Sequence, residues 1–327
     1  MKYNTFTYGS GVLYGAANTV DSILPESGVS EGGDNFVVQG TGFINTSNDD
    51  DFTSSLNTVL WTDISVGGSV QTGVNHLVLS TGSSSGQTSG IESVSSYSDF
   101  QAEIFVNVPN DVNPPGDVKY LVYELYINAT TKAAIEIKKD IEGNFSLYCY
   151  TTNGGNVTSE QTKDWSRGNS TFKILRFGSV VYFIANGSVI FKAINFRGDV
   201  AKVRMYADNG SENFDVKNTA IKYYKFKPFV VFNDQPVHDT VIVSDKRARG
   251  KTPPSINERY ASGSYAGLVD ISVVSSSTTT GSNMFEYVYS DKLRLINSTK
   301  SGIKLSLISD PQISSPSGTR IGLGDGK

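Results

Sequence analysis

The amino-acid sequence predicts an all-β protein. Short segments rich in Val, Ile, Phe and Tyr follow one another along the chain, and Gly, Asn and Pro separate them. Gly is abundant, with 32 copies in 327 residues, and only 18% of the residues are charged. We find no segment with the length and period of a helix. This composition favours many strands and tight turns over helices or disorder.

The first strands are expected in the stretch ILPESGVSEGGDNFVVQGTGF, residues 23–43. Ile23-Leu24-Pro25 predicts a short strand that ends at the proline, which has no backbone donor. Ser27-Gly28 and 31–34 predict turns, because glycine adopts positive φ without strain. A second strand is predicted over 36–43. Two strands cannot bury a core on their own, so their partners must come from elsewhere in the chain.

The missing partners are predicted near the other end of the chain. The segment 229–237 predicts a strand with a tight turn at Asn233-Asp234, and 237–248 predicts another. The segment 267–288 alternates around a loop and ends on an aromatic strand. Together with 23–43, these segments amount to one small β-sandwich.

The two segments resemble the two halves of an immunoglobulin-like domain of the IPT/TIG family. The opening half matches in its order of strand, Pro, Ser-Gly, Gly-Gly and strand, ending on Gly40-Thr41-Gly42-Phe43. The closing half matches in Gly-x-Val-Asp-Ile-x-Val at 267–273 and in Phe285-x-Tyr287. The resemblance implies a domain formed by residues 20–45 plus 227–290, with a second domain inserted at residues 46–226. Exposed loops tolerate such insertions.

About a dozen antiparallel strands are predicted across 46–226, including 100–108, 120–128, 133–139 and 145–151. Asn186-Gly187 indicates a type I′ hairpin turn. This many antiparallel strands imply two stacked sheets.

The inserted segment resembles the concanavalin A-like lectin/glucanase superfamily, which includes laminin G-like modules. The resemblance lies in the order and spacing of several short motifs: Leu60-Trp61, His76-Leu77-Val78-Leu79, Asp99-Phe100-Gln101-Ala102-Glu103, Trp165 before 172–176, Tyr182-Phe183-Ile184-Ala185-Asn186-Gly187, and 205–210 leading to Phe214-Asp215. It implies a jelly-roll sandwich, and it covers most of 46–226.

The glucanase signature of that superfamily is absent. Glucanases carry Glu-x-Asp-x-x-Glu or a close variant on one strand, and retaining hydrolysis needs two carboxyl groups about 5 Å apart. The nearest match starts at Glu136, but position i+2 is Lys138, and Asp140 and Glu142 fall in a predicted turn. We therefore predict that the protein is not an enzyme. A carbohydrate-active enzyme stays the alternative.

Strand parity predicts a candidate glycan-binding surface. Phe145, Leu147 and Cys149 share one face of a strand and indicate core, whereas Ser146, Tyr148 and Tyr150 share the other. Aromatic rings with polar tips suit stacking on sugars. The same alternation gives the full candidate set: Tyr126, Tyr148, Tyr150, Tyr206, Glu124 and Glu136. Two alternatives stay open, because these tyrosines could be ordinary surface residues or could be covered by another subunit.

No cofactor is predicted, apart from calcium as a candidate. Asp208, Glu212 and Asp215 supply carboxylate oxygens in a loop, which suits calcium, and relatives in the superfamily bind it. The spacing matches no defined calcium loop, so solvated turns are the alternative.

The chain ends are predicted to be attachment arms. FTYGSGVLYG, within residues 1–19, resembles the N-terminal arms of phage virion proteins. Residues 291–327 predict one strand at 303–308 and then a Ser/Pro/Gly-rich extension. The combination resembles phage proteins that decorate capsids or tails.

The bulk properties narrow the function further. The net charge of −4 favours neither nucleic acid nor an anionic membrane, and no apolar run approaches the roughly 20 residues of a membrane helix. We expect no secretion signal at Met1, and Cys149 is the single cysteine, so a cytoplasmic site of synthesis in a host cell is expected.

These observations predict a non-enzymatic virion structural protein present in many copies or as a homo-oligomer. The arms and the immunoglobulin-like domain would bind other virion proteins, and the lectin-like domain would face outward toward polysaccharide. A bacterial surface adhesin is a further alternative, but it should carry an export signal.

Overall fold

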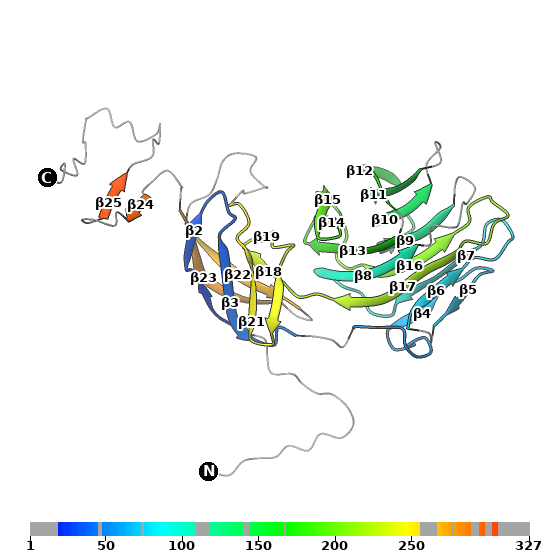
Figure 1. Ribbon diagram of the computed structural model, residues 1–327, viewed down its shortest axis with the longest axis horizontal. Helices are drawn as coiled ribbons and strands as arrows, with labels where there is room; N and C mark the ends of the chain where they lie inside the picture. The colour runs from blue at the N-terminus through cyan, green and yellow to red at the C-terminus, as the bar shows by residue number, and fades with distance from the viewer. Residues whose placement is uncertain are drawn as a thin grey trace, which may run out of the picture. The chain divides into compact units, whose positions relative to one another are not determined.

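The computed structural model describes residues 19–44, 48–72, 75–108, 118–139, 144–166, 168–255, 267–275, 278–288, 294–297 and 303–306. The described residues form strands and no helix, so no membrane-spanning helix is found among them. The chain divides into two compact units (Figure 1). The larger contains Ile44–Pro228 with Val274–Ser276, and the smaller contains the chain on either side. Of the predicted arm at residues 1–19, all but Thr19 lies outside the described residues, as does most of the C-terminal extension.

The smaller unit contains two sheets. One has the order β1-β3-β21-β20, and the other has the order β19-β18-β22-β23-β2. Their bounds are β1 Thr19–Leu24, β2 Ser27–Val29, β3 Asn35–Thr41, β18 Phe229–Phe232, β19 Gln235–Pro236, β20 Val241–Ser244, β21 Arg247–Lys251, β22 Gly267–Val274 and β23 Thr278–Val288. A separate hairpin joins β24 Arg294–Asn297 to β25 Ile303–Ser306. The sequence predicted β25 but not β24.

Distant parts of the chain make the core of the smaller unit. β3 pairs with β1 on one side and with β21 on the other, so that Val38 lies opposite Ala248. Phe36 contacts Phe232 edge to face, with ring centroids 5.1 Å apart, and Phe232 contacts Phe285 in the same way. The split sandwich predicted from the sequence is therefore present. Its membership of the IPT/TIG family stays a prediction.

Two local predictions in this unit were wrong. The segment 237–248 forms not one strand but parts of β20 and β21, joined by a turn at Asp245 and Lys246. Ser27-Gly28, predicted as a turn, lies in β2, which pairs in parallel with β23. Gly28 is required there for close approach, since an added Cβ would lie 2.8 Å from both the Phe285 ring and the Asp34 carboxylate.

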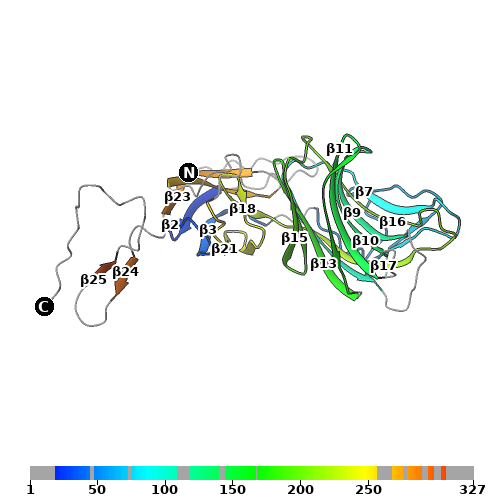
Figure 2. The same cartoon turned by 90° about the horizontal axis from the view of Figure 1, so that it is seen from above.

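The larger unit consists of two seven-stranded antiparallel sheets. The front sheet has the order β12-β11-β10-β9-β16-β7-β4, and the back sheet has the order β15-β14-β13-β8-β17-β6-β5. The long strands of both sheets can be followed from above in Figure 2. The bounds are β4 Trp61–Asp63, β5 Ser69–Gln71, β6 Leu77–Ser80, β7 Thr88–Ser93, β8 Phe100–Val108, β9 Lys119–Asn128, β10 Thr131–Lys139, β11 Phe145–Asn153, β12 Asn156–Asp164, β13 Gly168–Phe177, β14 Val180–Ala185, β15 Ser188–Ala193, β16 Lys202–Asp208 and β17 Lys217–Phe226. The predicted fold class, an all-β chain with a jelly-roll-type sandwich inserted in a smaller one, is confirmed.

The core of the larger unit lies between the two sheets and follows the predicted parity. Phe145, Leu147 and Cys149 of β11 are buried in it. One irregularity changes the parity of β9. The register shifts between Ile137 and Lys138 of β10, so that Tyr120 and Leu121 of β9 both enter the core. Lys119 thereby returns to the opposite face of the front sheet, which we call the outer face.

Candidate functional site

The outer face of the front sheet carries tyrosines and charged residues in register across neighbouring strands. One row runs from Tyr148 on β11 through Glu136 on β10 and Val122 on β9 to Tyr206 on β16. In the next row, Tyr150 lies opposite Ala134, Ala134 opposite Glu124, Glu124 opposite Arg204, and Arg204 opposite Glu92. In a third row, Tyr126 lies between Lys132 and Lys202. Residues that are far apart in sequence thus form one surface.

Two tyrosines on β11 form a fixed pair. The rings of Tyr148 and Tyr150 stack with centroids 4.9 Å apart and an interplanar angle of 27°. The Tyr148 hydroxyl donates to Glu160 on β12, and the Tyr150 hydroxyl donates to Glu136 at 2.8 Å. The Lys138 ammonium lies 3.8 Å from the centroid of the Tyr148 ring. Contacts on several sides therefore hold the Tyr148 ring in one orientation.

The expectation that Tyr150 is exposed was wrong. Its relative exposure is 6%, because it packs with Val122 and Ala134 in a small cluster that also contacts Tyr148 and Tyr206. Burial raises the pKa of the Tyr150 hydroxyl well above its ordinary value, and the neighbouring Glu136 adds to the shift. Tyr126, Tyr148 and Tyr206 are half-buried, so each residue stays partly accessible. Tyr150 supports this surface from below.

The two candidate glutamates are also buried, with relative exposures of 1% for Glu124 and 4% for Glu136. Glu124 lies 3.5 Å from the Lys132 ammonium and 3.9 Å from the Arg204 guanidinium. Burial raises the pKa of Glu124, although both cations oppose the shift. Glu136 accepts the Tyr150 hydroxyl and lies 3.8 Å from the Lys119 ammonium. Both carboxylates thus hold cations and a tyrosine and are not accessible to a ligand. This differs from the prediction that they bind glycan directly.

Strand parity predicted Arg204 on this face, but the sequence did not reveal its partner Glu92 on β7. The guanidinium of Arg204 lies 3.1 Å from the centroid of the Tyr126 ring, and its Nε donates to Glu92 at 2.6 Å. Lys202 donates to the same carboxylate at 2.6 Å. Burial opposes ionisation of Glu92, but hydrogen bonds from Lys202 and Arg204 outweigh it and lower the pKa of Glu92. Glu92 lies on β7, whose Ser- and Gly-rich sequence gave no clear strand pattern.

A glycine makes room for the last tyrosine of the row. Gly90 of β7 lies opposite Tyr206, and a Cβ at Gly90 would lie 2.3 Å from the Tyr206 Cβ. Tyr206 can therefore lean over β7. Burial raises the pKa of the Tyr206 hydroxyl, and Glu124, Glu136 and Asp208 add to the shift.

The three calcium candidates are not assembled into a site. Asp208 lies 3.3 Å from the Lys119 ammonium and accepts the Gly210 amide at 2.8 Å. Asp215 accepts the Ser80 hydroxyl at 2.9 Å and the Gly82 amide at 3.0 Å. Among the described residues, no three or more His, Cys, Asp or Glu side chains are grouped so that they could hold a metal. Asp208, Glu212 and Asp215 therefore do not form such a group. The carboxylates of Asp208 and Asp215 thus bond to loop amides, a hydroxyl and a lysine, and calcium binding by this set stays a prediction.

Comparison with known proteins gives similarity only among solved structures. No family model matches the sequence, and no curated protein matches it. The apo Crh5 transglycosylase is 12% identical with a TM-score of 0.47, over 63% of this chain and 91% of that chain. A Bacillus licheniformis beta-glucanase is 15% identical with a TM-score of 0.43, over 56% and 99%. The carbohydrate-binding module CBM66 from Bacillus subtilis is 15% identical with a TM-score of 0.36, over 52% and 94%. These similarities assign no activity or ligand to this chain.

Proposed function

We propose that the larger unit binds polysaccharide along the outer face of its front sheet without cleaving it. The observation that carries this proposal is the set of half-buried rings of Tyr126, Tyr148 and Tyr206, which lie among cations on one face. The C–H groups of a sugar pack against the accessible parts of these tyrosines, and its hydroxyls bond to charged groups. Lys138 beside Tyr148 and Arg204 beside Tyr126 supply such donors.

The arrangement fits an extended chain of sugars. The row from Tyr148 to Tyr206 crosses β11, β10, β9 and β16. Three strand spacings of about 4.8 Å separate its ends by roughly 14 Å. The Tyr148 ring is already fixed by Tyr150, Glu160 and Lys138, so binding would cost little side-chain entropy.

The burial of the two carboxylates supports binding without hydrolysis. A glycosidase needs two carboxyl groups that reach the scissile bond from either side. Here Glu124 is held by Lys132 and Arg204, and Glu136 by Tyr150 and Lys119. We expect no release of reducing sugar from β-glucans or bacterial polysaccharides. Turnover that disappears in Glu136→Gln would overturn this part of the proposal.

We further propose that the protein is a structural component of a phage virion, with the larger unit available to host polysaccharide. This rests on the sequence resemblance of residues 6–15 to attachment arms and on the split sandwich. Mass spectrometry of purified particles should find the chain in fixed stoichiometry. Its absence from particles, together with display on a bacterial surface, would favour an adhesin instead.

Two tyrosines on opposite faces provide a matched test of the binding surface. Tyr223 on the back sheet resembles Tyr148 in its contacts, since its hydroxyl donates to Glu103 at 3.0 Å and Lys225 lies 4.7 Å from its ring centroid. Tyr148→Ala should weaken polysaccharide binding by about 1–3 kcal/mol, or roughly five- to 150-fold, whereas Tyr223→Ala should leave it unchanged. Isothermal titration against a polysaccharide panel measures both.

The same variants separate the proposal from a subunit contact. If the outer face binds another subunit, Tyr148→Ala would bind glycan as the unmodified protein does but would fail to enter particles. Normal binding and normal assembly would show that the outer face has no recognition role.

A further inference from the structure

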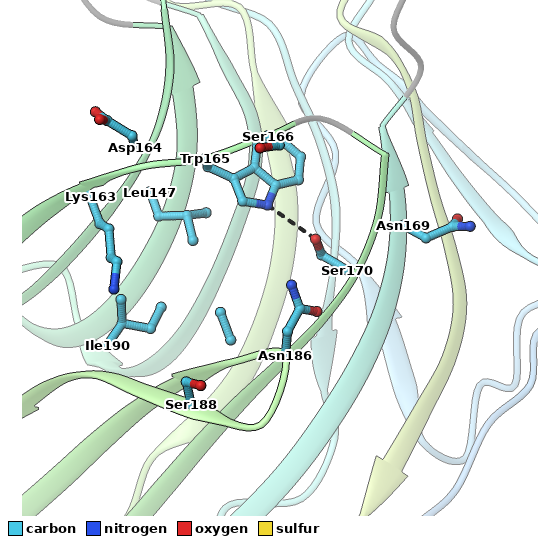
Figure 3. A pocket seen from close by; sticks show the side chains of 11 residues that line it. Leu147, Lys163, Asp164, Trp165, Ser166, Asn169, Ser170, Asn186, Ser188 and Ile190 are labelled. Atoms are coloured by element: carbon cyan, nitrogen blue, oxygen red, sulfur yellow. Dashed lines mark hydrogen bonds between the residues drawn. The ribbon is translucent and has the colours of Figure 1, made fainter.

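A pocket separate from the outer face lies at the edge of the larger sandwich, with a volume of about 370 Å³. It lies near β12, the edge strand of the front sheet, and β15, the edge strand of the back sheet (Figure 3). Its lining residues are Leu147, Lys163, Asp164, Trp165, Ser166, Asn169, Ser170, Ala185, Asn186, Ser188 and Ile190. None of them belongs to the rows of the outer face described above.

Strand parity decides which charged group points inward. Lys163 lies opposite Leu147, a core residue, so it takes the inward side of β12. Asp164 lies opposite Ser146 and takes the other side. Figure 3 agrees, because the Lys163 chain extends toward Ile190 while the Asp164 carboxylate points away. Among the described residues of the lining, the inward-facing side therefore carries an ammonium group and no carboxylate.

The Trp165 ring forms one side of the pocket. The Trp165 indole donates from Nε1 to the Ser170 hydroxyl at 3.1 Å, and the Trp165 amide donates to the Phe145 carbonyl at 3.1 Å. Trp165 is half-buried, so these bonds fix a ring that still offers surface. Leu147 and Ile190 give the pocket an apolar side.

A polar group faces Trp165 across the pocket. Asn186 adopts a φ of 49° in its turn, and its Oδ1 accepts the Thr171 amide at 2.9 Å. Its amide nitrogen is thereby turned toward the side of Trp165 and Ser170 (Figure 3). The Ser188 hydroxyl adds a second polar group on the same side.

We infer that this pocket binds one acidic sugar unit, a pyranose that carries a carboxylate. Trp165 and the apolar side accept the C–H face of the ring, and Asn186 and Ser188 bond to its hydroxyls. Lys163 neutralises the carboxylate, since the ion pairs found among the described residues do not include it. The volume lies near the lower end of the range of about 300–1,000 Å³ for small-molecule sites, which suits one unit instead of a long chain. This site does not depend on polysaccharide binding at the outer face.

Intrinsic fluorescence can report this site selectively. The chain has two tryptophans, and Trp61 is buried in the core. Glucuronate and galacturonate should shift the fluorescence emission of Trp165 in the full chain. The same shift should occur in a Trp61→Phe variant, in which Trp165 is the remaining tryptophan. Glucose and galactose should bind at least about tenfold more weakly, because they lack the group that pairs with Lys163. Equal binding of neutral and acidic sugars, or no emission change with either acid, overturns the inference.

Variants of Lys163 separate ligand binding from a structural role. An inward lysine on an edge strand also discourages edge-to-edge pairing, and that role needs no sugar. Lys163→Met should weaken uronate binding about tenfold or more, and Lys163→Arg should restore it. Lys222 is an exposed lysine on the back sheet beside Phe105. The matched control is Lys222→Met, which should bind uronate as the unmodified protein does. Ser188→Phe should fill the pocket and abolish binding.

The variants also distinguish this site from the outer face. Unchanged uronate binding in Lys163→Met or in Ser188→Phe contradicts the inference. Tyr148→Ala should leave the uronate signal intact. Loss of that signal in Tyr148→Ala alone would place the acidic sugar on the outer face and overturn the edge site.

Discussion

At the scale of single residues, Cys149 shows how burial controls reactivity. It lies on the inward side of β11, and burial raises the pKa of its thiol to about 12. At pH 8 the thiolate fraction is then about 10⁻⁴, and only the thiolate reacts. We expect no labelling by a disulfide reagent such as DTNB in the folded protein and one thiol per chain in denaturant. Fast labelling without denaturant would show that the core of the larger unit is open at β11.

Glu92 provides a pH test at the same scale. Its pKa is lowered by Lys202 and Arg204, so its contribution to the free energy of unfolding is present above its ordinary value of about 4.5 and is lost as the pH falls through the lowered value. Glu92→Gln should cost about 1–2 kcal/mol at pH 7. Urea unfolding should show this difference between the two proteins shrinking as the pH falls below about 4.5. A difference that does not change with pH would mean that the ion pairs add nothing to stability.

At the scale of elements, consecutive residues of β11 have different roles: one packs in the core, and the next belongs to the proposed binding surface. Leu147 faces the core and Tyr148 faces outward, although they are neighbours in sequence. Leu147→Ala should lower the free energy of unfolding by about 2–5 kcal/mol. Tyr148→Ala should lower it by only about 0.5–1.5 kcal/mol, through its stacking on Tyr150. Chemical denaturation of both variants tests this, and equal losses would place Tyr148 in the core.

The sequence predicted the faces of these strands because parity is a local property. The inward side of β10, β11 and β16, and of β9 from Leu121 onward, followed from alternation alone, and the tyrosines of the outer face were found in this way. The predicted exposure of Tyr150 was wrong, because exposure depends on neighbouring strands. Tyr150 is buried by Val122 of β9 and Ala134 of β10, and no local pattern indicates that packing.

The cross-strand partners could not be predicted from the sequence either, because they also depend on which strands pair. Arg204 meets Tyr126 only because β16 pairs with β9, and it meets Glu92 only because β16 pairs with β7. The strand β7 itself was hidden in a Ser- and Gly-rich stretch. The edge pocket was also missed, because it depends on where Lys163 and Ser188 lie at the edges of different sheets.

At the scale of the whole molecule, the described residues of the two units form two large cores that share no buried residue. The smaller core is built by β3 pairing with β21 across the inserted segment. We therefore expect that replacing 44–228 with a short Gly/Ser linker leaves a folded β domain, and that 44–228 alone also folds. Circular dichroism and cooperative thermal unfolding check both pieces. An unfolded small piece would show that its sandwich depends on the insertion.

We propose above that an extended sugar chain binds along the outer face of the front sheet. A crystal structure of the full chain with the oligosaccharide that binds best tests it most directly. We expect sugar rings packed against Tyr148 and along the row toward Tyr206, with Lys138 or Arg204 bonded to hydroxyls and no bond cleaved. Sugar bound only on the back sheet or on the smaller unit, or a cleaved product beside Glu136, would contradict it.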